Sequence, residues 1–236
     1  MKKFLLPAAL ALSCTFSSCK HDTQSHGEHH KAAQDSSTHS HGKANEYMHQ
    51  SNLDELVKRF ESPERDAYQQ PQKVMEYLGD ISGEKIMDLG AGTGYFTFKL
   101  ADAGAQVIAA DVDDQFQQYI KHKKKELDLS DEQISLRKIP YDDPLLESGE
   151  VDKVLLVNTY HHIENRVDYF AKVLKGLNED GELIIIDFIE GDLPVGPPAD
   201  HKVDKSDIIE ELKKAGFTNF DVNDDLLEYQ FIIKTN

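Results

Sequence analysis

The feature that most constrains the fold is a glycine-rich segment, GAGTG at residues 90–94, which directly follows the apolar run KIMDL at 85–89. Closely spaced glycines permit a tight turn and let the main chain approach a ligand. An apolar strand, a glycine-rich turn and a helix in this order predict a nucleoside-binding α/β unit. The spacing is G-x-G-x-G, unlike the G-x-G-x-x-G of dinucleotide sites, and no Lys-Ser or Lys-Thr pair follows to hold a phosphate.

Beyond this segment, short apolar runs alternate with helical patterns. The runs that predict strands lie at 85–89, 106–111, 134–138, 151–158, 182–188, 217–222 and 226–234. The helical patterns between them lie at 95–102, 115–125, 166–176 and 205–215. Strands that alternate with helices predict a parallel sheet with helices on both faces. The last two strands, joined by a short turn at 223–225, should form an antiparallel hairpin. The predicted fold class is therefore α/β, with a seven-stranded, mostly parallel sheet.

Acidic residues stand at the ends of the first two predicted strands. Asp88 lies two residues before Gly90, and Asp111 ends the second strand, 21 residues after Gly90. An acid at the end of the second strand can accept hydrogen bonds from two ribose hydroxyls. An acid at the end of the first strand can order the glycine loop or meet an ammonium group. These positions therefore favour a nucleoside-containing ligand.

In these residues the chain resembles the class I S-adenosylmethionine-dependent methyltransferases, and the resemblance extends from about Leu53 to the C-terminus. The segment DLGAGTG at 88–94 matches the first motif of that family, which surrounds the methionine end and the ribose of the cofactor. Three further segments are similar to a little-characterised bacterial branch: PERDAYQQP at 63–71, NTYHHI at 158–163 and LPVGPP at 193–198. The resemblance implies a Rossmann-like methyltransferase fold with S-adenosyl-L-methionine as cofactor.

The resemblance also implies which residues bind the cofactor. Asp111 matches the ribose-binding acid, and Val112 would lie beside the adenine. Many relatives place an acid just after the third strand to bind the adenine amino group. Here that region reads KIPYDD, so Asp142 or Asp143 would substitute for it. The implied cofactor-binding residues are Asp88, Gly90, Gly92, Gly94, Asp111, Val112, Asp142 and Asn158.

The fourth predicted strand ends in the polar and aromatic cluster NTYHH at 158–162. Open α/β sheets bind their ligands at this carboxyl edge. Methyl transfer from a sulfonium needs in-line positioning, and a base of near-neutral pKa helps where the nucleophile starts protonated. We therefore predict His161 or His162 as the base, with the ring of Tyr160 facing the sulfonium. Alternatively, one of the histidines only holds the loop before the next helix.

Two helical patterns precede the sheet. Ser51 can cap the first, and Pro71 opens the second, which ends near Gly79. Between them, Arg65 can pair with the carboxylate of the cofactor or with its own acidic neighbours. The segment 191–201, rich in Pro and Gly, would cover the acceptor pocket.

The N-terminal region resembles a bacterial lipoprotein signal at residues 1–19, with two lysines, a short apolar stretch and a small-residue end. In such signals the final cysteine, here Cys19, becomes the acylated first residue of the mature protein. A low-complexity tether follows at 20–46. The methyltransferase domain occupies 47–236, with 47–80 as an N-terminal helical lid. This organisation predicts a lipid-anchored protein of the cell envelope, on its periplasmic or surface side, or a cytoplasmic protein if the signal is not used.

Seven of the eleven histidines lie between His21 and His49. Neutral imidazoles at this density can bind zinc, copper or nickel. Alternatively, the tether is only a solvated spacer. The candidate metal ligands are His21, His26, His29, His30, His39 and His41. Both cysteines, Cys14 and Cys19, precede the tether, so the domain has no disulfide or Cys-ligated metal site.

The acidity of the chain limits its partners. The net charge is −17, and the first 46 residues are nearly balanced with five lysines and four acids, so the negative charge belongs to the domain. Such a surface repels nucleic acid and anionic lipid headgroups. We therefore predict a methyltransferase with a small-molecule acceptor, in contact with a membrane only through its N-terminal lipid. Because S-adenosylmethionine is kept in the cytoplasm, the alternative is a tethered binding module, for a metal or a nucleoside-like ligand, on an inactive methyltransferase scaffold.

Overall fold

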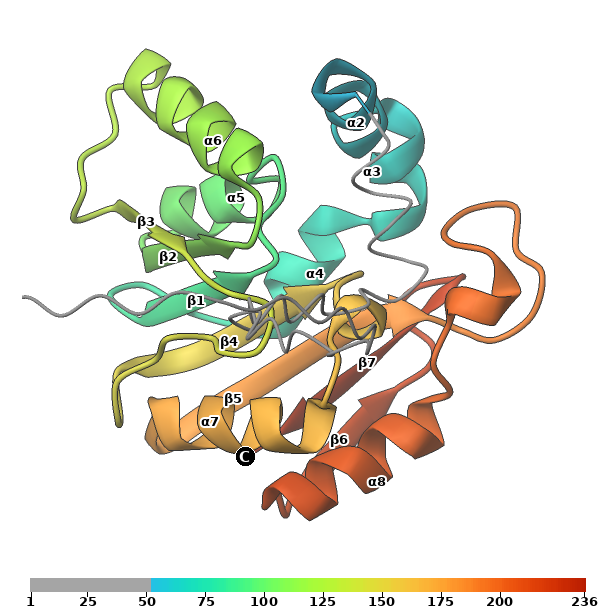
Figure 1. Cartoon of the computed structure of the whole chain (residues 1–236). Helices are drawn as coiled ribbons and strands as arrows, with labels where there is room; N and C mark the ends of the chain where they lie inside the picture. The colour runs from blue at the N-terminus through green and yellow to red at the C-terminus, as the bar shows by residue number, and fades with distance from the viewer. Residues whose placement is uncertain (1–51) are drawn as a thin grey trace, which may run out of the picture. The chain divides into compact units, whose positions relative to one another are not determined.

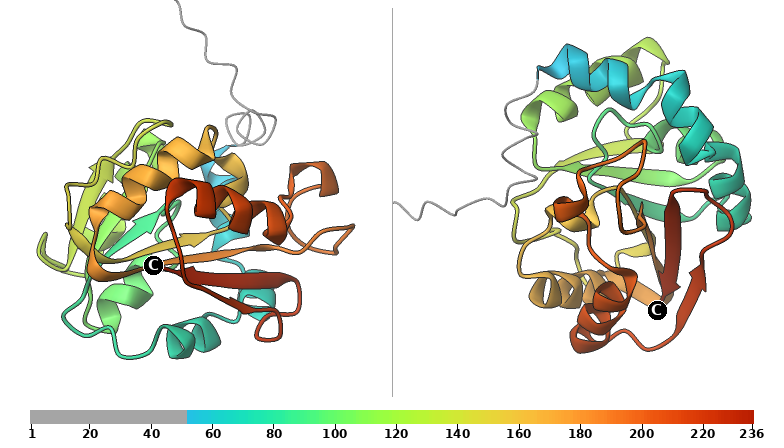
Figure 2. Two further views of the ribbon diagram at one scale, coloured as in Figure 1. Left: turned by 90° about the horizontal axis from the view of Figure 1, so that it is seen from below. Right: turned by 90° about the vertical axis from the view of Figure 1, so that its right-hand side faces the viewer.

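The computed structural model describes residues 52–236, which form a seven-stranded sheet with helices on both faces (Figures 1 and 2). The strand order is β3-β2-β1-β4-β5-β7-β6. The strands are β1 (Lys85–Leu89), β2 (Gln106–Asp111), β3 (Ile134–Lys138), β4 (Val151–Val157), β5 (Leu177–Phe188), β6 (Phe220–Asn223) and β7 (Gln230–Thr235). The first five pair in parallel, and β7 pairs antiparallel with both β5 and β6. The predicted fold class is confirmed.

Helices α4, α5 and α6 cover one face of the sheet, and α7 and α8 cover the other. The helices are α2 (Leu53–Phe60), α3 (Pro63–Gln69), α4 (Pro71–Leu78), α5 (Thr97–Asp102), α6 (Asp114–Glu126), α7 (Arg166–Gly176) and α8 (Lys205–Ala215). Successive residues of a strand point to opposite faces, so Met87 of β1 packs in one core and Ile86 in the other. Burial on both faces explains why the central strands are apolar throughout. Among the described residues, no helix is both long and apolar enough to span a bilayer.

The hairpin at the C-terminus differs from the prediction in the length of its turn. Strand β6 ends at Asn223 and β7 begins at Gln230, whereas the sequence predicts a turn of three residues. The side chain of Asn223 accepts hydrogen bonds from the main-chain N–H groups of Asp225 and Leu226, at 3.0 and 2.9 Å. These hydrogen bonds to the asparagine side chain stabilise the longer loop, which forms no further strand pairs.

The N-terminal region contains one helix more than the sequence predicts. Helix α2 is capped by Asn52, whose side chain accepts from the N–H of Asp54 at 2.8 Å, and not by the predicted Ser51. The additional helix α3 is capped by Ser62 and begins with a proline, both of which favour a helix start. Gln70, at φ 43°, separates α3 from α4. The predicted signal, Cys19, the tether and its candidate metal ligands lie outside the described residues.

Candidate functional site

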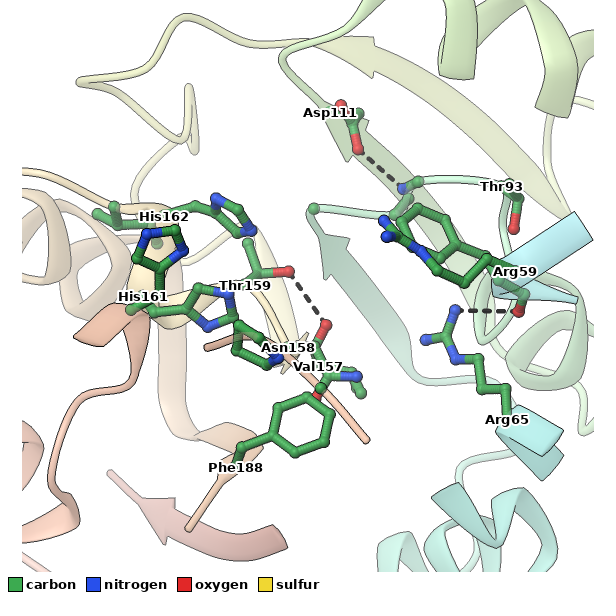
Figure 3. A pocket seen from close by; sticks show the side chains of 18 of the residues that line it. Arg59, Arg65, Thr93, Asp111, Val157, Asn158, Thr159, His161, His162 and Phe188 are labelled. Atoms are coloured by element: carbon green, nitrogen blue, oxygen red, sulfur yellow. Dashed lines mark hydrogen bonds between the residues drawn. The ribbon is translucent and has the colours of Figure 1, made fainter. Parts of the chain in front are cut away.

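A cavity of about 750 Å³ lies at the carboxyl ends of the central strands, where α2 and α3 also contribute side chains. The wall of the cavity has two regions. The glycine-loop half comprises the described lining residues Arg59, Arg65, Gly90, Gly92, Thr93, Asp111 and Val112. The histidine half comprises His161, His162, Phe188, His201 and the loop 192–199. Figure 3 shows His161, His162 and Phe188 on one side of the cavity and Asp111, Thr93, Arg59 and Arg65 on the other.

The glycine loop has positive φ at all three glycines: 78° at Gly90, 54° at Gly92 and 80° at Gly94. A side chain at Gly90 would place its Cβ 2.4 Å from the methyl group of Thr159. A side chain at Gly94 would lie 2.6 Å from the ring of Phe98, in the packing against α5 rather than in the cavity. Gly90 and Gly92 therefore line the cavity as predicted, whereas Gly94 permits close packing beneath it.

Asp111 lies at the end of β2 and its carboxylate lines the cavity. One oxygen accepts from the N–H of Gly92 and the other from the N–H of Asp113, both at 2.8 Å. Burial raises the pKa of this carboxyl to about 6, although the two N–H groups favour its ionised form. Each carboxylate oxygen keeps acceptor capacity beyond one N–H bond. Because it can still accept from two neighbouring hydroxyls, Asp111 fits a ribose, and Val112 lines the cavity beside it.

Asp88 is buried beneath the glycine loop and does not line the cavity. It accepts a hydrogen bond of 2.6 Å from the hydroxyl of Thr97, the first residue of α5. Burial raises the pKa of Asp88 to about 6, while Thr97 and Arg65 favour the charged form. Asp88 therefore ties the end of β1 to the start of α5 and does not line the cavity.

Arg65 extends from α3 into the glycine-loop half, and its guanidinium makes few hydrogen bonds. Its guanidinium lies 4.0 Å from the centre of the Tyr95 ring and donates to the main-chain oxygen of Phe60 at 3.1 Å. Its Nε is buried and has no hydrogen-bond partner. Burial lowers the pKa of Arg65, yet a guanidinium stays charged in proteins. A half-buried cation with an unused donor suits a carboxylate.

The two predicted base candidates both line the histidine half, in the short 3₁₀ helix η1 (Tyr160–His162). Nδ1 of His161 lies 3.1 Å from both carboxylate oxygens of Asp187 at the end of β5. The ring of His162 lies 4.3 Å from that of His161, centre to centre. Burial, together with His161 and His201, lowers the pKa of His162 to about 3, although Asp187 opposes this. His162 is therefore neutral at physiological pH, and His161 is the histidine paired with a carboxylate.

Besides Asp88 and Gly94, two further predicted site residues lie outside the cavity. Tyr160 is fully buried, stacks on Phe170 at 5.0 Å and donates its hydroxyl to Glu211 at 2.6 Å. Successive side chains of a 3₁₀ helix point about 120° apart, so its three residues cannot all face one cavity. Asp142 is exposed, and its main-chain oxygen accepts from Lys172. The predictions that Tyr160 faces the sulfonium and that Asp142 binds the adenine are therefore wrong for this structure; Ile139 and Tyr141 line the cavity instead.

Asn158 lines the cavity and belongs to a closed ring of three amides that the sequence does not predict. Its side chain donates to Gln69 of α3 at 3.1 Å, and Gln69 donates to Gln230 of β7 at 2.9 Å. Gln230 completes the ring by donating to Asn158. Both glutamines are fully buried. The ring joins α3, which carries Arg65, to the ends of two strands of the sheet.

Histidines and acids of the described region do not form a metal site. In residues 52–236, no group of three or more His, Cys, Asp or Glu side chains is arranged to hold a metal ion, and this includes the histidines of the cavity. Asp187 had no sequence signal beyond its place at the end of a predicted strand. Only its contact with His161 in the folded structure connects Asp187 with the site.

Comparisons with known proteins agree with this architecture. Residues 87–185 match a family model described as a methyltransferase domain. A solved S-adenosylmethionine-dependent methyltransferase from Aquifex aeolicus superposes with a TM-score of 0.71 at 21% identity, covering 78% of this chain and 98% of that one. At this identity the likeness establishes the fold, which is the Rossmann-like methyltransferase fold.

Curated relatives match over about half of this chain. An uncharacterized methyltransferase of Staphylococcus carnosus is 28% identical over 52% of this chain and 56% of its own length. A tRNA U34 carboxymethyltransferase of Alcanivorax borkumensis is 29% identical over 51% and 38%. A demethylmenaquinone methyltransferase of Tropheryma whipplei is 25% identical over 47% and 44%. The chain therefore matches only about a third to just over half of the length of these relatives, and their names differ in the acceptor.

Proposed function

We propose that this chain is an S-adenosylmethionine-dependent methyltransferase that acts on a small-molecule acceptor. The observation that carries the proposal is the convergence, in one cavity, of Asp111, the glycine loop and the cation of Arg65. These groups come from β2, from the turn after β1 and from α3. Asp111 can accept from ribose hydroxyls, the glycine loop lets the main chain approach a nucleoside closely, and Arg65 can pair with a carboxylate. A nucleoside-linked amino acid needs all three.

Each lining group has a role in this proposal. Asp111 accepts from the ribose hydroxyls, and Arg65 donates to the amino-acid carboxylate. Val112 and Ile139 supply apolar contact for the adenine in place of the predicted acid. When bound, S-adenosylmethionine supplies a methyl group on a positively charged sulfur, which a nucleophile can displace. The protein then has mainly to position the acceptor in line with that methyl group and to exclude water.

The size and charge of the molecule support a small acceptor. A cavity of about 750 Å³ is in the range of small-molecule sites, including the space that the cofactor needs. The net charge of −17 disfavours tRNA, the substrate named for one group of relatives, because a negative surface repels a phosphate backbone. The loop 192–199 contributes a Pro-rich wall to the histidine half, which further encloses the acceptor.

Calorimetric titration of the full-length protein tests the proposal. S-adenosylmethionine, S-adenosylhomocysteine and 5′-methylthioadenosine should all bind, without any requirement for zinc. Replacing Arg65 with Gln should weaken the two amino-acid-bearing ligands about tenfold, the effect of losing about 1.4 kcal/mol from a charge-assisted hydrogen bond. It should leave 5′-methylthioadenosine unchanged, because this ligand lacks the carboxylate.

Arg59→Gln is the matched control, since Arg59 also lines the cavity but is exposed on α2, whereas Arg65 is half-buried. This variant should retain the preference for the amino-acid-bearing ligands. Absence of binding by all three ligands would remove the methyltransferase proposal and leave the binding-module alternative.

A further inference from the structure

The pair of His161 and Asp187 has the geometry of a histidine oriented by a carboxylate. Nδ1 of His161 lies 3.1 Å from each oxygen of Asp187, and both side chains are only 4% exposed. Asp187 also accepts from the N–H of Phe188 at 2.8 Å. Burial alone would raise the pKa of Asp187, but His161 and the N–H of Phe188 outweigh it and hold the pKa below its usual value. Asp187 is therefore a carboxylate at neutral pH.

An ionised carboxylate can only accept hydrogen bonds, so the ring nitrogen that faces it must carry the hydrogen. In a neutral imidazole whose Nδ1 bears the hydrogen, Nε2 has a free lone pair. His161 lines the cavity whereas Asp187 does not, so the carboxylate acts from behind the ring. The contact with Asp187 thereby selects the tautomer in which Nε2, the nitrogen across the ring from the carboxylate, can accept a proton.

The groups around His161 describe the acceptor that this half of the cavity suits. His162 on the same 3₁₀ helix and His201 on η2 (Ala199–His201) also line it. The ring of Phe188 lies 5.9 Å from that of Tyr68, centre to centre. Gly196 packs so closely on Phe188 that a Cβ there would lie 2.6 Å from the ring. These contacts build an aromatic wall beside the histidines, and the arginines among the described lining residues belong to the glycine-loop half.

We propose, on the basis of the proposed function, that Asp187 is a positioning residue that holds His161 as the base for a small aromatic hydroxyl acceptor. The acceptor oxygen forms its bond to the methyl carbon while the carbon–sulfur bond breaks and leaves its electron pair on sulfur. The hydroxyl proton passes to Nε2 of His161, and the imidazolium is stabilised by Asp187. The products are an aryl methyl ether, a neutral thioether and a proton that His161 later releases to water.

Nitrogen NMR of the full-length protein labelled with ¹⁵N-histidine tests the role of Asp187, with the His161 signals assigned by their loss in His161→Gln. In the wild type, Nδ1 should carry the hydrogen and Nε2 should be unprotonated. In Asp187→Asn the majority tautomer should reverse, because the asparagine amide can donate to Nδ1. Asp192→Asn, which removes an acid of the cavity wall itself, should leave the tautomer unchanged. A proton on Nε2 in the wild type, or an unchanged tautomer in Asp187→Asn, would overturn the positioning role.

The same spectra test the acceptor class with phenol and anisole as probes, in the presence of S-adenosylhomocysteine. Phenol can donate to Nε2 and should shift its resonance, whereas anisole has no hydroxyl and should not. Equal shifts, or no shift with either probe, would overturn the aromatic hydroxyl class. Calorimetry separates this outcome from a failure of the proposed function. Asp187→Asn should bind S-adenosylhomocysteine within twofold of the wild type, since Asp187 lies outside the cavity wall, whereas a wild type that does not bind it would refute the methyltransferase proposal itself.

Discussion

Asp111 in the glycine-loop half and Asp187 behind the histidine half are each buried at the carboxyl end of a strand, yet their pKa values move in opposite directions. Burial raises the pKa of Asp111 to about 6, because only main-chain N–H groups offset the loss of water. The imidazole of His161 holds the pKa of Asp187 below its usual value despite equal burial. The partner, and not the depth of burial, therefore decides the direction of the pKa shift of a carboxyl at this edge.

The two halves also differ in how they are built. In the glycine-loop half, the loop itself presents main-chain groups of consecutive residues, and the N–H of Gly92 donates to Asp111 of the neighbouring strand. The histidine half uses side chains from η1, from the end of β5 and from the loop that follows it. A site built from the main chain tolerates few changes at its glycines, whereas a site built from side chains can change its acceptor through substitutions.

The largest expected effect comes from Gly90, which packs closely on Thr159, the residue before η1. Gly90→Ala places a methyl group in the space of Thr159 and forces φ 78° on a residue with a side chain, which costs roughly 1–2 kcal/mol before any clash. We expect the affinity for S-adenosylmethionine to fall about 100-fold or more, which is about 2.7 kcal/mol. Gly83→Ala is the control, because it has φ 81° but nothing within 4 Å of the added Cβ. It should lower the melting temperature slightly and leave calorimetric binding intact.

Asp111→Ala should weaken S-adenosylmethionine by about 1–3 kcal/mol, or about 5- to 150-fold, because the ribose hydroxyls lose a charged acceptor. Titration calorimetry measures this directly. Asp142→Ala is the control, since Asp142 is an exposed acid outside the cavity. Its removal should leave the affinity for S-adenosylmethionine unchanged. Equal affinities for the wild type and Asp111→Ala would refute the ribose assignment.

Gln230→Leu tests the amide ring that connects α3 with the strand ends. It leaves the buried Gln69 and the half-buried Asn158 each without one partner, which should lower the free energy of unfolding by about 2 kcal/mol. Chemical denaturation measures the loss. Gln72→Leu replaces an exposed glutamine at the start of α4 and should be nearly neutral. If both variants unfold at the same denaturant concentration, the ring does not stabilise the attachment of α3 to the sheet.

The smallest expected effect is a pH dependence of S-adenosylmethionine binding. It should come from Asp111, whose pKa is raised, and not from Asp187, whose pKa is lowered. Because the pKa of Asp111 in the free protein is about 6, this group takes up a proton as the pH falls through 6, while ribose binding favours the ionised form. Affinity for S-adenosylmethionine should therefore be constant above about pH 7 and fall toward tenfold per pH unit, about 1.4 kcal/mol, well below pH 6. Asp111→Asn should flatten this dependence. An unchanged slope in Asp111→Asn would assign it to another group, such as Asp88, whose pKa is also about 6.

Local signals predicted one part of the molecule well. The bounds of β1, β2 and β3 are as predicted, because a short apolar run bounded by turn residues defines a buried strand without reference to the rest of the chain. Gly90, Gly92 and Asp111 were placed in the cavity for the same reason, since each stands at or just beyond such a strand end. Helix α3 was missed because two short helices separated by one residue leave little periodicity to detect.

Other residues were misplaced or missed because adjacency in sequence does not set orientation. Tyr160 and His161 are neighbours, yet one enters the core and the other the cavity, according to the turn of a 3₁₀ helix. Asp142 follows β3 as the expected acid would, but the loop carries it to the surface. No pattern near Gln69 indicates that its amide meets a residue 161 positions further along the chain.

From β1 onward, the sequence alone determined the succession of strands and helices along the chain, the glycine loop and the acid that closes it, because these depend on periodicity and on residues close together in the chain. Only the tertiary structure decided which side chains share the histidine half. His161 meets Asp187 across 26 residues, and Asn158 meets Gln69 across 89. Such pairs form when strands far apart in sequence end at one edge of the sheet. Their contact follows from the packing of the whole domain, which no local pattern encodes.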